Sequence, residues 1–262
     1  MSTLKKRSPL RIFFAVQNAL FYRELGVRIT NGRSGLFWTF FEPFVQIMVF
    51  VLIKVVIFGR NGTTFDYAAF IALNFLGFNL FRNIVNRSAG VFKANKALFV
   101  YKQVKPIDAL LARAGVEIFI TAILILIFYG LGLVLGHDTH IKDVNMVAFG
   151  FVFLILFSLA VALVIAVLNL FYQSVGKLVG IAMMGLMFGS AVIYPVNGTP
   201  PAFADFILVN PLTHFIELIH GSYFYALDTH HVSFSYMLTW TVVLAFVGLW
   251  LYVMLEQRII TQ

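Results

Sequence analysis

The stretch from Val91 to Arg113, VFKANKALFVYKQVKPIDALLAR, is the only long polar interruption in the first half of the chain. It contains one acid, Asp108, and five basic residues: Lys93, Lys96, Lys102, Lys105 and Arg113. The segments on both sides are apolar enough to cross a bilayer, and a basic loop between two spans is expected to face the cytoplasm. The sequence therefore predicts a cytoplasmic elbow at residues 91–113, between two membrane spans.

The dipeptide Lys105-Pro106 sets the shape of this elbow. Proline ends any helix that arrives from Gly90 and fits the first turn of a new one, where Asp108 complements the helix dipole. The prediction is a rigid bend that protrudes from the membrane and on which a soluble partner can push. The alternative is a charged turn that only fixes the topology.

Composition gives the class of protein. Of the 262 residues, 61% are hydrophobic and 11% are charged, and the mean hydropathy is +0.92. Soluble domains carry about a quarter charged residues, so an integral membrane protein is predicted. The absence of cysteine excludes disulfides, thiolate metal sites and a cysteine nucleophile. Topology and anionic lipid explain the net charge of +8 better than nucleic acid does, because most basic residues flank apolar spans.

Residues 1–35 are predicted to form a cytoplasmic arm and an amphipathic helix on the inner membrane surface. Residues 10–33 are too short and too often charged to span. Apolar residues such as Ile12 and Leu20 fall on one side, whereas Gln17, Glu24 and Arg28 fall on the other. Glu24 and Arg28 are spaced to pair with each other at i, i+4.

Residues 36–262 are predicted to be an all-α transmembrane domain. The six expected spans are residues 36–58, 66–85, 115–136, 144–170, 175–193 and 236–255. Asn74, Asn79 and Asn83 predict that the second span faces protein or water on one side, since amides that face lipid go unsatisfied.

Glu42 lies about two helical turns inside the first span, next to Pro43, where an unpaired carboxylate is costly. One hypothesis is that it pairs with a basic residue from another inner segment. The alternative is that its carboxylate reaches headgroup water.

The fifth span contains two pairs of glycines with a spacing of four residues: Gly176, Gly180, Gly185 and Gly189. Such pairs allow helix backbones to approach closely, which predicts a packing face. Ordinary glycine enrichment in membrane helices is the alternative.

Residues 194–235 are the least regular part of the chain. Asn210-Pro211 splits two apolar pieces that are each too short to cross, so a re-entrant or interfacial helical hairpin is expected at the outer face. His214, Glu217 and His220 have the spacing H-x-x-E-x-x-H, but helical positions three and six apart sweep through about 120°. That geometry is poor for one ion, so no metal site is predicted.

The distribution of charge sets the predicted orientation. Sixteen of the nineteen lysines and arginines fall on the expected inner side, two fall outside and Lys54 lies in a span. Both termini are therefore predicted to be cytoplasmic. Many aromatic residues lie at the outer hairpin, either as an interfacial belt or as a path along which sugar rings slide. The candidates for this path and its outer gate are Trp38, Phe41, Tyr194, Phe215, Tyr223 and Phe224.

Three stretches carry a resemblance to a known family: SGLFWTFFEPFVQIMVF at residues 34–50, KALFVYKQVKPIDALLAR at residues 96–113 and VNPLTHFIELIHGSYF at residues 209–224. The chain resembles the membrane (permease) subunit of ABC-2 type exporters, and in particular the capsular polysaccharide export permeases of Gram-negative bacteria. The stretch at residues 96–113 is the most specific of the three.

The resemblance implies a homodimer in the inner membrane that binds two copies of a separate ATPase and exports a lipid-linked glycan. ATP and Mg would bind to the ATPase, with no cofactor on this chain and no enzymatic activity of its own. The chain has no phosphate-binding loop, because Gly176-Lys177 is followed by leucine and lacks the upstream glycine. Outer-membrane export proteins and membrane lipid are the further expected partners, and nucleic acid is not expected.

By the same resemblance, the surface helix and the elbow would contact the ATPase, and the hairpin would close the periplasmic end. The coupling residues are then Phe21, Glu24, Arg28, Lys93, Lys96, Tyr101, Lys102, Lys105, Pro106 and Asp108. The same scaffold could instead export an O-antigen, teichoic acid, lipid or drug. From a different class, an intramembrane enzyme acting on lipid-linked sugars would use Glu42, Asp66 or Glu217 as acid or base.

Overall fold

The computed structural model describes residues 8–30, 35–58, 64–137 and 139–261. Part of the predicted surface helix, residues 31–33, and residues 59–63, between the first two predicted spans, lie outside these ranges. The helices are α1 (Pro9–Thr30), α2 (Gly35–Phe58), α3 (Tyr67–Ser88), α4 (Val91–Asn95), α5 (Pro106–Leu135), α6 (Val144–Phe171), α7 (Ser174–Phe188), α8 (Pro201–Leu208), α9 (Pro211–Tyr223) and α10 (Phe234–Thr261), with short 3-10 turns η1 (Lys96–Leu98) and η2 (Val196–Gly198).

The predicted all-α membrane fold is confirmed. Within the described ranges, α2, α3, α5, α6 and α10 are long and apolar enough to cross a bilayer. They correspond to five of the six predicted spans, and α5 extends its span inward as far as Pro106. The remaining predicted span, residues 175–193, contains α7, whose 15 residues cover about 22 Å at 1.5 Å per residue.

The chain beyond α7 shows how such a short helix is accommodated. Ser190, Ala191 and Val192 are buried but not helical, and exposed non-helical backbone is not tolerated in hydrocarbon. Protein side chains satisfy the carbonyl groups here. Asn210 Nδ2 donates to Gly189 O at 2.9 Å, Asn74 Nδ2 donates to Val192 O at 3.1 Å, and the Tyr67 hydroxyl donates to Ile193 O at 3.1 Å.

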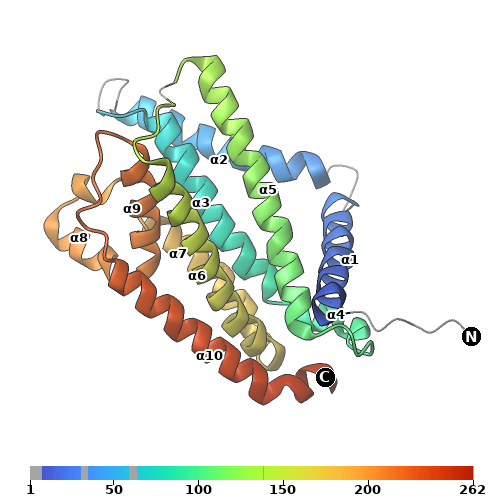
Figure 1. The fold of residues 1–262 in the computed structure, drawn as a ribbon. Helices are drawn as coiled ribbons and strands as arrows, with labels where there is room; N and C mark the ends of the chain where they lie inside the picture. Colours follow the sequence, from blue (N-terminus) through green and yellow to red (C-terminus); the bar gives the residue numbers. More distant parts are fainter. Residues whose placement is uncertain (1–7, 31–34, 59–63, 138, 262) are drawn as a thin grey trace, which may run out of the picture.

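Helix α3 is the centre of the bundle (Figure 1). It packs against α2, α5, α6 and α9, and most of its length is buried. Its three asparagines face protein as predicted: Asn74 contacts α9, Asn79 donates to Gln46 of α2 at 3.0 Å, and Asn83 bonds to Glu117 of α5. The Asp66 carboxylate caps the helix by accepting from the Ala68 and Ala69 amides.

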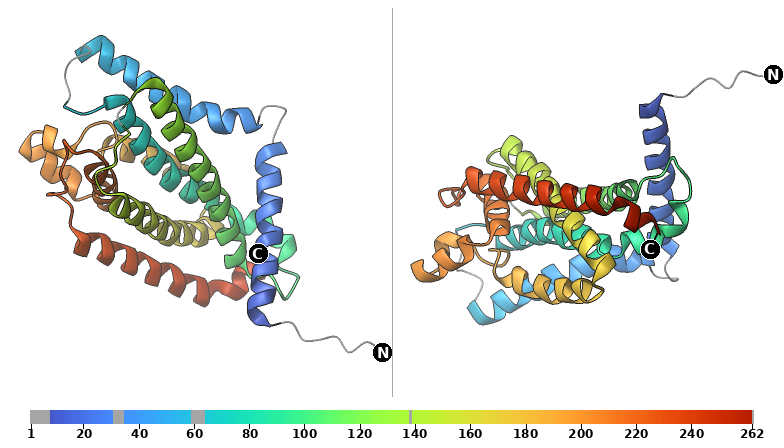
Figure 2. Two further views of the ribbon diagram at one scale, coloured as in Figure 1. Left: turned by 45° about the horizontal axis from the view of Figure 1, so that its top comes forward. Right: turned by 90° about the horizontal axis from the view of Figure 1, so that it is seen from below.

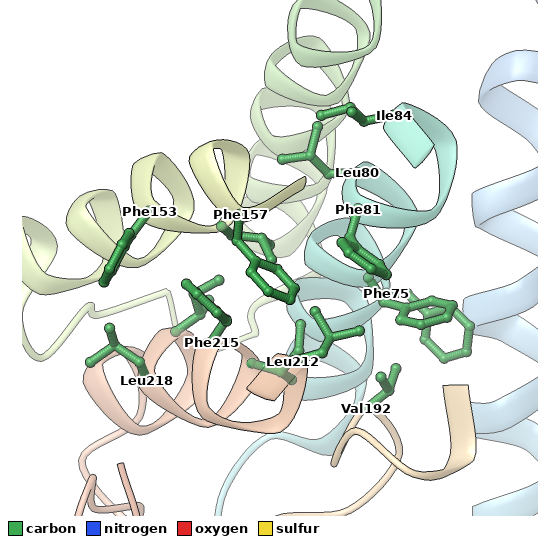
Figure 3. Close-up of a cluster of buried hydrophobic side chains, with 14 of the residues drawn as sticks. Phe75, Leu80, Phe81, Ile84, Phe153, Phe157, Val192, Leu212, Phe215 and Leu218 are labelled. Carbon is green, nitrogen blue, oxygen red and sulfur yellow. The ribbon is translucent and has the colours of Figure 1, made fainter. Parts of the chain in front are cut away.

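The main core lies where α3, α6 and α9 meet (Figure 3). The ring of Phe157 on α6 stacks against that of Phe215 on α9 at a centroid distance of 4.8 Å. It also stacks against the ring of Phe81 on α3, at 5.7 Å. These aromatic rings are almost completely removed from solvent. Because lipid is as apolar as this core, the rings stabilise the bundle through close packing and not through removal of apolar surface from water.

The segment between α7 and α10 folds as a helical hairpin. Helices α8 and α9 meet at 110° across Asn210-Pro211, where the Asn210 side chain caps α9 by accepting from the Leu212 amide at 3.0 Å. Figures 1 and 2 place this hairpin and the α5–α6 loop at one end of the bundle. The opposite end carries α1, α4 and the C terminus. We refer to these as the hairpin end and the elbow end.

Candidate functional site

The predicted elbow exists as a compact unit at the elbow end. It consists of α4, η1 and a turn that leads to Pro106. Val91, Phe92 and Phe99 are buried against α5, α6 and α10, whereas Val100 and Tyr101 at the tip are 82% and 65% exposed. The elbow therefore has a fixed base and an apolar tip that projects from the molecule.

The start of α5 follows from Lys105-Pro106, as predicted. Lys105 is extended, with φ −92° and ψ 151°, and Pro106 is the first helical residue. The Lys105 amide donates to Asp108 Oδ2 at 2.8 Å, so this buried carboxylate caps α5. Asp108 Oδ1 also accepts from the Gln17 side chain of α1 at 3.3 Å. One carboxylate thus ties the helix start to the surface helix.

Helix α1 is held to this unit by its polar side. The guanidinium of Arg113 on α5 binds Glu24 with Nε at 2.9 Å from Oε2 and Nη2 at 3.4 Å from Oε1. Arg23 bridges Glu24 at 2.6 Å and the Asn95 side chain of the elbow. Burial alone would raise the pKa of Glu24, but the hydrogen bonds and charges of Arg113 and Arg23 lower it overall. The carboxylate is therefore charged at neutral pH.

The predicted pair between Glu24 and Arg28 within α1 was wrong. Arg28 lies instead 3.7 Å from Glu117 of α5, because the side of α1 that was expected to face water packs against α5. Phe21 of α1 also packs against α5, with its ring centroid 5.8 Å from that of Phe119. The polar side of α1 thus provides contacts within the protein.

Sequence reasoning missed Glu117. Its side chain is 2% exposed and lies 2.9 Å from the Nε of Arg87 at the end of α3. Arg113 also donates to the Arg87 carbonyl at 2.8 Å, so Glu117 joins α1, α3 and α5 into one charged cluster. A signal was available, since a carboxylate within an apolar span requires a partner.

The exposed lysines of the elbow lie around its tip and next to a groove. Lys93, Lys96, Lys102 and Lys105 are all exposed. Between α4 and the α6–α7 turn is a groove of about 430 Å³, lined in part by Gly90, Lys93, Asn169 and Gln173. The Asn169 side chain donates to the Ala89 carbonyl at 2.8 Å and accepts from the Gly176 amide at 2.7 Å, which fixes the wall of the groove.

Comparison with known proteins gives this arrangement a context. The model of the ABC-2 type transporter family matches residues 17–224, which include most of the surface helix α1, the elbow and the α8–α9 hairpin. The chain belongs to the ABC-2 type transporter family. It is 28% identical to the polysialic acid transport protein KpsM of Escherichia coli over 97% of this chain and 99% of KpsM.

Two other relatives have similar names. The capsule polysaccharide export inner-membrane protein CtrC of Neisseria meningitidis is 25% identical, and the match covers 86% of each chain. BexB of Haemophilus influenzae, also a capsule polysaccharide export inner-membrane protein, is 24% identical over 93% of this chain and 92% of BexB. This ABC-2 chain thus aligns with each of them over most of its length.

In this ABC-2 chain, Glu42 pairs with a basic residue of another helix, as the first hypothesis predicted. Its Oε1 lies 2.9 Å from Nη2 of Arg82 on α3, yet its side chain remains 56% exposed. Gln46, one turn further along α2, is 3.4 Å from the same Glu42 oxygen and accepts from Asn79. Glu42 is therefore paired and also accessible from outside the bundle.

The residues proposed for a glycan path do not lie together. Trp38 and Phe41 are exposed neighbours on α2, 5.6 Å apart. Phe215 and Phe224 are core residues, so the prediction that they line a path does not match this conformation. The sequence alone does not distinguish an aromatic residue of the core from one that lines a path.

Tyr194 and Tyr223 occupy intermediate positions. Both are half-buried near the hairpin, and the Tyr194 hydroxyl donates to the Phe188 carbonyl at the end of α7. Among the six candidates for the glycan path, Tyr194 and Tyr223 therefore lie at the hairpin end and keep part of their rings exposed.

A buried polar group fastens the hairpin to α3. Asn74 uses its amide nitrogen to bond Val192 O, so its Oδ1 accepts from Nδ1 of His220 at 3.1 Å. The other ring nitrogen of His220 lies 3.0 Å from Oε2 of Glu217. His214 instead bonds the Leu208 carbonyl at 3.0 Å and so holds α8 to α9.

Replacing Asn74 by alanine is expected to destabilise the hairpin end. The change leaves the His220 ring nitrogen and the Val192 carbonyl without these bonds, at a cost of about 1–3 kcal/mol for each buried group. We expect a fall of several degrees in the melting temperature of the purified protein, measured by intrinsic fluorescence. Asn18→Ala at an exposed position of α1 is the control. Equal melting temperatures for the two variants would contradict this role of Asn74.

The four glycines of the predicted packing face have different surroundings. A Cβ on Gly176, in the first turn of α7, would lie 2.8 Å from the Asn169 side chain of α6, and Gly189 ends the helix. A Cβ on Gly180 or Gly185 would meet nothing within 4 Å in this chain. Gly180 and Gly185 therefore each have open surroundings, but they lie about 140° apart around α7 and do not form one face.

Proposed function

We propose that this chain is the permease subunit of an ATP-driven exporter of capsular polysaccharide, in a bacterial inner membrane with both termini cytoplasmic. Polysaccharide as the substrate class is supported by the names of its relatives and by the large share of this chain that aligns with them. The basic residues gathered at the elbow end support the orientation.

The observation that carries the proposal is an exposed apolar tip on a fixed base. Val100 and Tyr101 project from an elbow whose base packs against α5, α6 and α10. A large exposed apolar group ringed by charged residues is typical of a protein-binding surface. Its proposed partner is a separate cytoplasmic ATPase, which binds ATP and Mg, and the groove next to Lys93 receives a further part of that partner.

An ion pair to α5 and a hydrogen bond to the elbow make α1, α5 and the elbow move as one unit in the proposed mechanism. The Glu24–Arg113 and Arg23–Asn95 contacts join them, and Glu117 passes the same displacement to the end of α3 through Arg87. Closure of two ATPase subunits would then tilt α3 and α5 in each copy. This tilt would separate α2 and α7 of the two copies and open a channel.

A second copy of the chain completes the proposed exporter. The open space around Gly180 and around Gly185 on α7 leaves room for a close helix contact between the two copies. The substrate is a glycan whose anionic lipid-linked end is attracted by the basic elbow end. Export proteins of the periplasm and outer membrane receive the glycan beyond the hairpin end.

The direct test is purification of the chain with its candidate ATPase. Both proteins are co-expressed, the chain carries the affinity tag, and ATP hydrolysis and surface polysaccharide are measured in cells that lack their own permease. We expect equimolar recovery of the two proteins and restored capsule. Glycan modification by the purified chain without any ATPase would show that it is an enzyme instead.

A further inference from the structure

An apolar groove runs along α3 at the hairpin end, between α2 and α5. It has a volume of about 300 Å³ and is lined by residues that include Ile47, Val51, Ala69, Ala72 and Phe128. Its lining on α3 extends from Ala68 to Leu76, about 12 Å of helix. Helices α2 and α5 both pack on α3 and leave this space between them.

The groove has the character of a site for hydrocarbon. Nearly all of its lining is apolar, and an apolar cavity of about 150 Å³ stays free of water and holds one benzene molecule. Twice that volume holds a hydrocarbon segment of about twelve carbon atoms. Met48 and Tyr129 on its rim are 60% and 41% exposed on helices that span the membrane, so the groove opens to lipid.

One end of the groove is polar. His137 and Thr139 of the α5–α6 loop line it there, and Nδ1 of His137 lies 2.5 Å from Oδ2 of Asp66. The other Asp66 oxygen caps α3, so both oxygens of this carboxylate are engaged within the protein. Lys54 does not line the groove, but it carries a positive charge close to this end: its Nζ lies 4.4 Å from the centroid of the ring of Tyr67, which directly precedes the lining residue Ala68.

We propose that this groove binds one acyl chain of an anionic membrane phospholipid, with the phosphate held near Lys54. The match is between an amphipathic ligand and a groove that is apolar along its length and has a lysine close to one end. The site does not depend on the exported substrate. Only its placement in the outer leaflet rests on the proposed orientation.

The bound chain would serve as a packing partner for α2. Because the contact of α2 with α5 is slight, the hydrocarbon would fill the space between them and let α2 shift without opening a void. A second copy of this protein is the competing occupant. The polar end favours lipid, because a phosphate complements Lys54.

Narrowing the groove tests the proposal. Ala72→Phe places a ring in it, whereas Ala122→Phe places the same ring on an exposed, lipid-facing position of α5. The proteins are purified with their ATPase, incubated with a mixture of dioleoyl phosphatidylglycerol and dioleoyl phosphatidylethanolamine, and analysed by native mass spectrometry. We expect Ala72→Phe to retain about tenfold less phosphatidylglycerol, since the loss of even two buried methylenes has this effect. Ala122→Phe should match the wild type.

Two further variants keep the test decisive. Ala69→Leu narrows the same groove more gently and should lower retention if Ala72→Phe does not fold. Lys54→Gln should remove the preference for phosphatidylglycerol over phosphatidylethanolamine. Wild-type lipid retention in a folded Ala72→Phe or Ala69→Leu protein would overturn the proposal. A disulfide between two copies through Met48→Cys, in a chain that otherwise lacks cysteine, would assign the groove to the second copy.

Discussion

Arg113→Glu is expected to abolish polysaccharide export. The new carboxylate would face Glu24 at the position where the guanidinium now binds both of its oxygens, and Glu117 lies one helical turn away. Loss of the pair costs about 2 kcal/mol, less than for a fully buried pair, because Glu24 is only partly buried and is left next to a like charge. The surface helix should then separate from the elbow. Capsule on intact cells and the melting temperature of the purified complex measure the two effects.

A charge swap distinguishes the effect of the Glu24–Arg113 ion pair from the effects of the two residues taken singly. The double variant Glu24→Arg with Arg113→Glu restores opposite charges across the contact, so it should recover part of both the export and the stability lost by Arg113→Glu. Arg11→Glu reverses an exposed charge on the same surface helix and should behave as wild type. Equal defects in the single and double variants would show that the α1–α5 ion pair does not carry the effect.

Reversing two charges near the elbow tip should uncouple ATP hydrolysis from export. Lys102 and Lys105 are exposed, so Lys102→Glu with Lys105→Glu should leave insertion and stability unchanged while it weakens contact with the ATPase. Loss of two favourable charge pairs at a protein interface reduces affinity by about tenfold or more. We expect normal amounts of permease in the membrane, little ATPase recovered with it, and capsule reduced to the level of the deletion strain.

Lys177→Glu provides the matched control for the elbow. This exposed lysine belongs to the inner end of α7, outside the elbow. If charge at the membrane surface mattered only for topology, Lys177→Glu and the elbow variant would have similar effects. Full export by the elbow variant would remove Lys102 and Lys105 from the coupling surface.

Replacement of Pro106, which starts α5, should also uncouple ATP hydrolysis from export, because it loosens the bend between the elbow and α5.

The bounds of the helices could be predicted because local chemistry sets them. Pro106 starts α5, Asn210-Pro211 divides the hairpin, and the apolar runs give the spans. Each of these signals depends on neighbouring residues alone. The non-helical end of α7 could not be predicted, because Asn74, Asn210 and Tyr67 support its backbone from distant parts of the chain.

The polar contacts at the site were harder to predict for the same reason. Glu24 and Arg113 are 89 residues apart, so the local i, i+4 partner of Glu24 was the only one visible in the sequence. Glu117 and His220 could have been found, since buried polar groups in apolar segments need partners. The partners of Glu117 and His220 could not be predicted, because these contacts depend on how α3 packs against its neighbours.

Labelling of a single cysteine at Tyr101 tests the central claim most directly. The chain has no cysteine of its own, and Tyr101→Cys places one thiol at the exposed elbow tip. A membrane-impermeant maleimide is applied to inverted vesicles and to intact spheroplasts, with and without the ATPase. We predict labelling in inverted vesicles only, and protection when the ATPase is bound. Labelling from the periplasmic side, or equal labelling with and without the ATPase, would contradict the account.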